Sequence, residues 1–172
     1  MACTLVIRNY NPDKVDYPYK PGDTYIGDTA DDINLSEIEI YDGSMKLTGL
    51  TGSMSSQLTV DHNGQHHSFD WSNCFNGIIY EDADLCHTSS SQVTGQPSML
   101  YVNLDNRKFD KVLVYNRLVA PVRIIGAEIY LLQGVSNATK KVWTDTFTVG
   151  ADKHAATLFT FNVAPIGHQH HR

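Results

Sequence analysis

The sequence predicts an all-β protein in which short antiparallel strands pack as a sandwich or barrel. Three observations support this fold class. About eight short segments alternate apolar and polar residues, Gly, Asn and Asp separate them at regular spacing, and no amphipathic segment predicts a helix of about ten residues. A length of 172 residues, with 41% hydrophobic and 19% charged residues, is typical of one globular domain.

The predicted strands share a two-residue period in hydrophobicity. In "INLSEIEIYD", Ile38 and Ile40 alternate with Glu37 and Glu39, which predicts a strand with one face toward the core and the other toward water. In chain order, the predicted strands are 4–8, 33–42, 44–50, 56–61, 99–105, 111–117, 126–133, 145–150 and 156–163.

Three regions differ in composition. Residues 1–32 are rich in Pro, Gly, Asp and Tyr, and we expect an extended arm that opens with a short strand. Residues 33–164 hold the remaining strands and predict the sandwich, while residues 165–172 form a polar, His-rich tail. Within the sandwich, residues 62–98 predict a long irregular loop, which is where a β scaffold usually places function.

Charge and hydropathy exclude some partners. A net charge of −6 without a Lys/Arg stripe argues against nucleic-acid binding. No apolar run is long enough to predict a membrane-spanning helix. The amino terminus has no pattern of a secretory leader, so we expect synthesis in the cytosol if Met1 is the natural start.

The cysteines do not show the close spacing of a zinc or thioredoxin-type site. Cys3, Cys74 and Cys86 are an odd number, and we expect free thiols in a reducing compartment. A Cys74–Cys86 bridge is the alternative if the protein is extracellular.

Several motifs occur in a fixed order that resembles a known family. They are "NLSEIEIYDG", "SMSSQ", "FNGIIYEDADLCHT", "PSMLYVNLDNRKFDKVLVYNR" and "RIIGAEIYLL". This series resembles the galactose-binding-like jelly roll of discoidin domains and F-type (fucose-binding) lectins, over roughly residues 33–163. The resemblance implies an antiparallel β-sandwich jelly roll, but this fold hosts both binding and structural functions.

The resemblance also implies a sugar site. His87 in "DLCHT" and Arg117 in "VYNR" fall where the family has its histidine and first arginine, and Arg123 matches the second arginine approximately. Forked guanidinium donors and an imidazole suit adjacent sugar hydroxyls. The family's supporting Asp would lie at Val119, and two arginines without a carboxylate between them repel each other. We therefore expect a vestigial site in which Arg117 holds loop carbonyls.

A cation site is a further expectation. Asn76, Asp82 and Asp84 offer the hard oxygen ligands that Ca²⁺ prefers. In the family that the chain resembles, a glutamate on a strand completes a structural Ca²⁺ site, and Glu128 in "GAEI" matches that glutamate. The alternative is a solvated acidic loop.

No sequence feature predicts an enzyme, because the chain lacks a P-loop, a dinucleotide-binding fingerprint, a nucleophile elbow and paired catalytic carboxylates. Two function hypotheses follow. The first is a structural interaction protein that binds other subunits, of a capsid or of its own kind, through its arm and faces. Similarity to discoidin-like proteins of large DNA viruses suggests a minor capsid or virion-surface role. The alternative is a fucose-type, cell-surface glycan-binding lectin that uses His87, Arg117 and Arg123.

Overall fold

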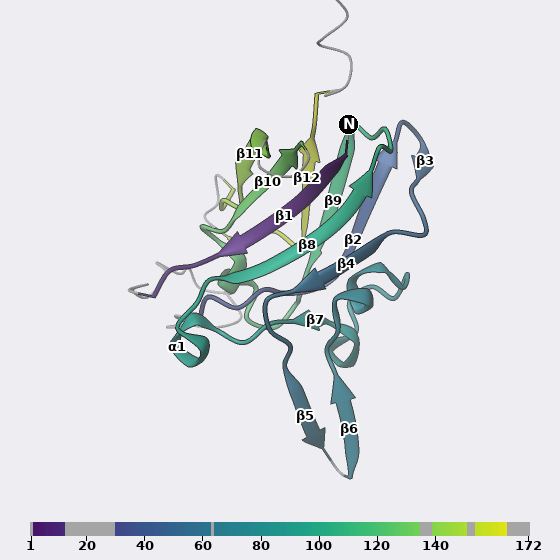
Figure 1. The fold of residues 1–172 in the computed structure, drawn as a ribbon. Helices are drawn as coiled ribbons and strands as arrows, with labels where there is room; N and C mark the ends of the chain where they lie inside the picture. The colour runs from purple at the N-terminus through teal and green to yellow at the C-terminus, as the bar shows by residue number, and fades with distance from the viewer. Residues whose placement is uncertain (1, 13–29, 63, 135–138, 151–153, 165–172) are drawn as a thin grey trace, which may run out of the picture.

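Two five-stranded antiparallel sheets face each other in a β-sandwich arrangement (Figure 1). The computed structural model describes residues 2–12, 30–62, 64–134, 139–150 and 154–164. The predicted all-β sandwich is therefore confirmed at the level of fold class. Among the described residues, no helix is long and apolar enough to cross a membrane.

The first sheet places the amino-terminal strand at its centre. Its strand order is β11 (Lys140–Thr146), β10 (Glu128–Gln133), β1 (Cys3–Asn9), β8 (Ser98–Asp105) and β4 (Thr51–Met54). All pairs are antiparallel, and β1 aligns Leu5 with Leu131 on one side and Val102 on the other. The predicted arm is thus corrected in its first part, because β1 belongs to the sandwich. Residues 13–29 of that arm, and the predicted tail at 165–172, lie outside the described residues.

The second sheet carries the segments that later form the site. It consists of β12 (Leu158–Asn162), β9 (Lys111–Asn116), β2 (Asn34–Asp42), β3 (Met45–Lys46) and β7 (Cys86–His87), which pairs with the beginning of β2. In β9 every second residue is buried, including Val112 and Val114, as expected for a strand that covers a core with one face.

The predicted long loop at 62–98 contains regular structure. A separate hairpin of β5 (Thr59–His62) and β6 (Gln65–Ser68) extends away from the sandwich (Figure 1). After it come two 3-10 helices, η1 (Trp71–Phe75) and η2 (Asp82–Asp84), and one turn of α-helix, α1 (Ser91–Thr94). A third 3-10 helix, η3 (Pro121–Ile124), follows β9. None of these short helices has the amphipathic length that a sequence pattern reveals.

The core lies between the two sheets. Leu5 and Ile7 of β1 meet Ile38 and Ile40 of β2 within one buried apolar cluster. Phe147 is fully buried, and its ring centroid lies 5.0 Å from the ring centroids of both Phe159 and Phe161. Such edge-to-face contacts add to the free energy gained from burying apolar area.

The acidic side chains on the outer face of β2 are buried, which contradicts the predicted exposure of that face. Glu37 and Glu39 were expected in water, yet Glu37 is 0% exposed and Glu39 is 9% exposed. The loop after η1 covers this face, and the backbone N–H of Gly77 donates to Glu37 Oε2 at 2.7 Å. Glu39 accepts hydrogen bonds from the hydroxyls of Tyr41 and Tyr115. A binary apolar-polar pattern therefore identified the strand correctly but not the environment of its polar face.

Candidate functional site

Strand pairing brings the three predicted sugar-site residues together. Asn34 at the start of β2 lies opposite His87 in β7. Arg117 directly follows β9, which neighbours β2, and Arg123 lies in η3. The burial of His87 (7% exposed) and Asn34 (1% exposed) places this cluster at the edge of the core.

Asn34 joins the two arginines. Its side-chain oxygen accepts from Arg117 Nη1 at 3.2 Å and from Arg123 Nη1 at 3.0 Å. The opposite amide orientation would place its NH₂ group against two donors, so the oxygen must face the guanidinium groups. An amide oxygen from another strand therefore lies between the two arginines.

Two further buried asparagines fix the loop that carries the arginines. Asn116 donates from Nδ2 to the Pro121 carbonyl at 2.9 Å and accepts from the Arg117 backbone N–H at 2.9 Å. Asn9 of β1 donates from Nδ2 to the Arg123 carbonyl at 2.8 Å. Since buried polar groups are costly unless they are hydrogen-bonded, these bonds set the loop geometry.

His87 is held neutral. Its Nδ1 lies 2.6 Å from the Thr88 carbonyl, which can only accept, so Nδ1 carries the proton and Nε2 carries the lone pair. Burial, together with the nearby charges of Arg117 and Arg123, lowers the pKa of His87 to about 4, against the opposing hydrogen bond to Thr88. Asp32 Oδ2 lies 3.8 Å from Nδ1. Nε2 lies 3.5 Å from the Asn34 amide group that also contacts both arginines.

A cavity of about 410 Å³ opens beside His87 and Arg117. Its other lining residues are Leu58, Val60, His67, Phe69, Asp82, Ala83 and Leu85. Val60 and His67 are directly opposite each other in the β5–β6 hairpin, so one face of that hairpin forms the apolar wall. The Phe69 ring centroid lies 5.8 Å from that of His87 and 6.4 Å from that of His67. The cavity thus combines an apolar and aromatic wall with a polar corner, as small-ligand sites commonly do.

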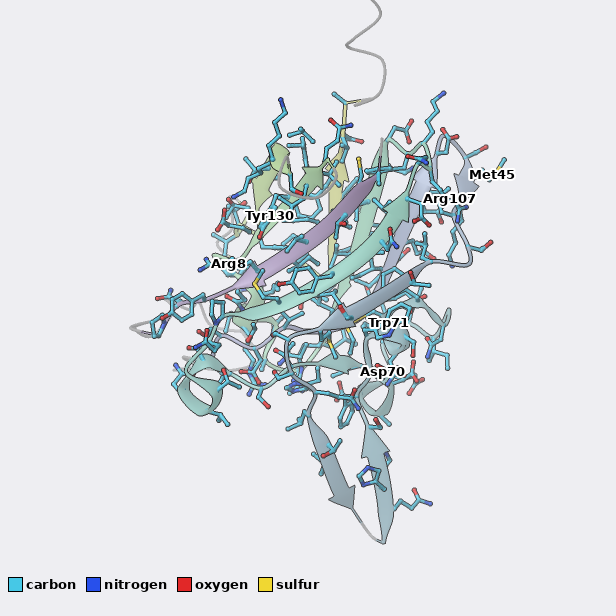
Figure 2. All side chains as sticks on the ribbon, in the orientation of Figure 1. Arg8, Met45, Asp70, Trp71, Arg107 and Tyr130 are labelled. Carbon is cyan, nitrogen blue, oxygen red and sulfur yellow. A yellow bond between two sulfur atoms is a disulfide. The ribbon has the colours of Figure 1, made fainter. Side chains whose placement is uncertain are left out.

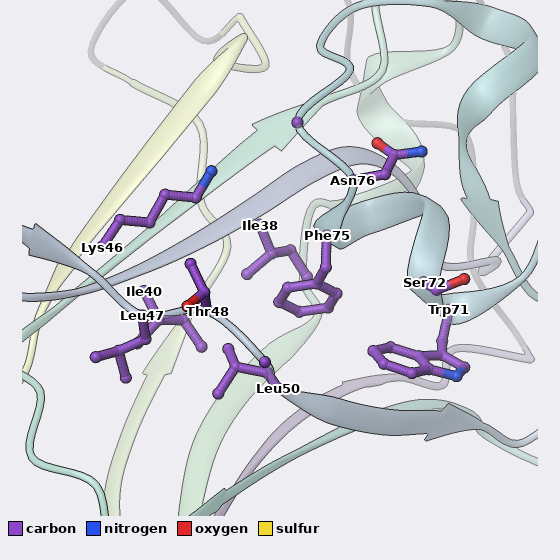
Figure 3. Close-up of a pocket in the computed structure, with 12 residues that line it drawn as sticks. Ile38, Ile40, Lys46, Leu47, Thr48, Leu50, Trp71, Ser72, Phe75 and Asn76 are labelled. Atoms are coloured by element: carbon purple, nitrogen blue, oxygen red, sulfur yellow. The ribbon is translucent and has the colours of Figure 1, made fainter.

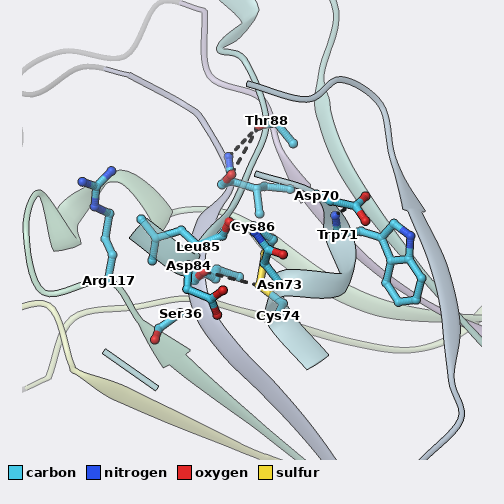
Figure 4. Close-up of a disulfide and its surroundings, with 12 residues drawn as sticks. Ser36, Asp70, Trp71, Asn73, Cys74, Asp84, Leu85, Cys86, Thr88 and Arg117 are labelled. Atoms are coloured by element: carbon cyan, nitrogen blue, oxygen red, sulfur yellow. Dashed lines mark hydrogen bonds between the residues drawn. A yellow bond between two sulfur atoms is a disulfide. The ribbon is translucent and has the colours of Figure 1, made fainter. Parts of the chain in front are cut away.

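A disulfide anchors the segment between the hairpin and β7. Cys74 in η1 is bonded to Cys86 in β7, and both residues are fully buried (Figure 4). This corrects the expectation that all three cysteines are free thiols. The bond holds the chain directly before His87, and Figure 4 shows Leu85 on the side that faces Arg117.

The four predicted calcium ligands do not form one set. Asn76 donates to Asp84 Oδ2 at 2.7 Å, and Asp82 lies on the wall of the cavity. Glu128 belongs to β10 in the first sheet, where it forms ion pairs with Arg8 at 3.6 Å and Lys141 at 3.5 Å. Arg8 and Tyr130 mark that outer face in Figure 2. In the described part of the chain, no group of three or more His, Cys, Asp or Glu residues could hold a metal ion. A cation site therefore stays a prediction, in which Glu128 takes its partners from the first sheet, away from the Asn76–Asp84 pair.

A second cavity, of about 430 Å³, lies at the open edge between β2 and the link from β3 to β4 (Figure 3). Its walls are mainly apolar, with Ile38, Ile40, Leu50, Trp71 and Phe75 around its centre. Among the predicted site residues it contains only Asn76. Lys46, Thr48 and Ser72 also line it, and none of them was among the predicted site residues.

Sequence reasoning missed Asn34 and Asn9. Both form hydrogen bonds with the arginine loop, Asn34 to the two side chains and Asn9 to the Arg123 carbonyl. The arginines lie many residues later in the chain, so no local spacing reveals these partners. Asn116 was visible within the "VYNR" motif, but its clamping role was not. Comparisons of the chain with protein-family models, with curated proteins and with solved structures found no match.

Proposed function

We propose that this protein is a non-catalytic glycan-binding module whose sugar site contains His87, Arg117 and Arg123. The same proposal includes the finer fold assignment, a galactose-binding-like jelly roll. One observation carries it: these three residues come from separate segments and converge on Asn34 beside a cavity with an apolar wall.

The chemistry of the cavity suits a sugar ring. Arg117 supplies hydrogen-bond donors in a fixed fork, and sugar hydroxyls can accept from them. The neutral ring of His87 lines the same cavity. The C–H face of the ring would lie against Phe69 and Leu85, which gains free energy from burial of apolar area.

The loss of the family's Asp does not leave the arginines without a shared acceptor. Asn34 supplies the oxygen, and Val119 is 39% exposed at the tip of the loop rather than between the guanidinium groups. A neutral amide holds two arginines less strongly than a carboxylate, because charge-assisted hydrogen bonds are about twice as strong as neutral ones. The site is therefore supported as an intact arrangement instead of a vestige.

A glycan array with the purified protein tests this function. We expect the wild type to bind a defined subset of glycans, and Arg117→Ala and Arg123→Ala to lose at least about tenfold in affinity. Lys108→Ala is the matched control, since it removes an exposed positive charge that does not line the cavity. Absence of wild-type binding, or binding that is indifferent to Arg117→Ala, would contradict the proposal.

A second candidate, a subunit contact in a larger assembly such as a virion, is favoured by a different surface. Tyr80 and Leu158 are 38% and 39% exposed, and Tyr115 lies opposite Leu158 in the β9–β12 pair. The Tyr80 and Tyr115 ring centroids are 5.9 Å apart, and the Tyr80 hydroxyl donates to the Thr157 carbonyl. These residues form a small aromatic and apolar patch, the kind of surface that protein interfaces use.

The contribution of the predicted arm to assembly can be tested without removing β1. The backbone N–H of Asn11 donates to Asp31 Oδ2 at 2.8 Å, so the ends of segment 13–29 are close together. Replacing residues 13–29 with a short Gly-Ser linker should leave the unfolding temperature unchanged. If the arm binds partner subunits, light scattering will show loss of assembly, whereas unchanged assembly counts against that role.

A further inference from the structure

Asp82 occupies a place in the cavity that its predicted calcium role does not explain. It begins η2, and it lines the same cavity as His87 and Arg117. Its neighbour Asp84 has a different partner, because Asp84 accepts from Asn76 and does not line the cavity. Within the described residues, the exposed Asp82 carboxylate has no hydrogen bond or ion pair to the protein.

Without Asp82, the cavity lining would have few hydrogen-bond acceptors for the donors of a ligand. Arg117 can only donate, and His87 Nε2 already lies 3.5 Å from the Asn34 amide. A sugar that presents adjacent hydroxyls brings several O–H donors, and each loses its bond to water on entering the cavity. A carboxylate has two oxygens that accept about four such bonds, so Asp82 supplies the acceptors that the arginine and histidine lack.

The charges around the cavity are also matched. One acid and one base line it, Asp82 and Arg117. Asp32 and Arg123 carry further opposite charges near His87, and neither lines the cavity. A carboxylate, sulfate or phosphate on the ligand would be attracted by Arg117 but repelled by Asp82 on the same wall.

We propose that Asp82 is a ligand-contacting specificity residue that accepts hydrogen bonds from sugar hydroxyls, and that this site selects neutral glycans over acidic ones. This inference rests on the proposed glycan-binding function. It replaces the calcium role predicted for Asp82 with a role in recognition.

The test uses the full chain and pairs of glycans that differ only in a terminal sialic acid. We expect Asp82→Ala to weaken binding of the neutral member by about 10- to 100-fold, the range for loss of a hydrogen bond to a charged group. Asp82→Asn keeps one acceptor oxygen, so it should lose less affinity for the neutral glycan and gain affinity for the sialylated one. Glu81→Gln is the matched control, because Glu81 is an exposed neighbouring acid that does not line the cavity.

The possible outcomes distinguish a failure of the role of Asp82 from a failure of the proposed glycan-binding function. If the wild type binds neutral glycans and Arg117→Ala abolishes binding, but Asp82→Ala and Asp82→Asn match Glu81→Gln, the role of Asp82 is overturned and the proposed function stands. Preference of the wild type for the sialylated member would overturn the selectivity. If the wild type binds no glycan, both proposals fail. Circular dichroism of each variant identifies any loss of fold, and Asp82→Asn, which keeps the size of the side chain, then serves as the deciding variant.

Discussion

Arg117 and Arg123 donate hydrogen bonds to one shared oxygen atom, although the loop that carries them has no acidic residue. The acceptor is the side-chain amide of Asn34, which strand pairing places opposite His87. The two like charges are therefore tied to the end of β2, and Arg117 also lines the cavity. This shared acceptor makes the arginine pair a defined structure and provides the first prediction.

Replacing Asn34 should loosen both arginines at once. We expect Asn34→Ala to lower the free energy of unfolding by about 1 to 3 kcal/mol, because two half-buried arginines lose a shared acceptor. Glycan affinity should fall at least about tenfold. Asn34→Asp keeps the acceptor and adds a compensating charge, so it should retain binding. Urea unfolding and glycan titration measure both effects, with the exposed Asn106→Ala as control. An Asn34→Ala protein that binds like the wild type would show that the shared acceptor is dispensable.

Stability should depend on pH through Glu37. Burial, helped by the charge of Glu39, raises the pKa of this carboxyl from 4.5 to about 7, against the opposing hydrogen bond from Gly77 and the charge of Lys46. Among the described residues, its Oε1 has no hydrogen-bond partner. Because the folded-state pKa is the higher one, the contribution of Glu37 to stability is complete below pH 4.5 and is lost as the pH rises through about 7.

The expected loss is at most about 3 kcal/mol, since one pKa unit corresponds to about 1.4 kcal/mol. Glu37→Gln cannot ionise, so its stability relative to the wild type should increase from about pH 5 to about pH 8. Urea unfolding at both values measures this difference, and Glu81→Gln serves as an exposed control. Equal pH slopes for the wild type and Glu37→Gln would rule out the proposed linkage.

Cysteine chemistry offers a direct test of the disulfide. Of the three cysteines, only Cys3 should react with an alkylating agent in denaturant without reductant, and all three should react after reduction. Mass spectrometry counts the labels. Cys74→Ser with Cys86→Ser should lower the free energy of unfolding by about 2 to 3 kcal/mol, because the bond closes a short loop. Glycan binding should weaken too, since Cys86 directly precedes His87. Three reactive thiols without reductant would exclude the bond.

Gly52 in β4 has no room for a side chain. A Cβ atom there would lie 2.5 Å from the Tyr101 carbonyl oxygen and 2.9 Å from the Trp71 ring. Gly52→Ala must therefore push β4 from β8 or displace Trp71 from its contact with Phe75. We expect a loss of about 1 to 3 kcal/mol in unfolding free energy, together with altered tryptophan fluorescence. Ser53→Ala, at an exposed position of the same strand, is the control. If Gly52→Ala were as stable as that control, β4 or Trp71 would be able to shift at little cost in free energy, and the prediction would be wrong.

Some elements were predictable because their signal is local. The alternation in 99–105 and 111–117 appears in the structure as β8 and β9, almost residue for residue. The segment 145–150 was predicted as a strand, but β11 covers Lys140–Thr146. That strand lies at the edge of its sheet and is mostly exposed, so its alternation is weak, while the strongly apolar Phe147 that attracted the prediction is buried just beyond its end.

Other features depend on contacts that no local pattern contains. The acidic side of β2 is covered because Gly77, forty residues later in the chain, donates to Glu37. The amino-terminal segment resembled an arm because its composition changes after Asn9, yet β1 lies between β8 and β10. Asp82 and Glu128 are both acids near apolar strands in the sequence, but one lies on a cavity wall and the other pairs with Arg8 and Lys141.

The sequence by itself determined the all-β class and singled out His87, Arg117 and Arg123 as candidates, because strand periodicity and short motifs are properties of neighbouring residues. Only the tertiary structure decided that these residues meet, that the Asn34 oxygen lies between the arginines, and that Cys74 and Cys86 are bonded. Each of these depends on which strands pair. The pairing is set by burial of apolar faces across the whole chain, so it brings together polar groups that no sequence spacing connects.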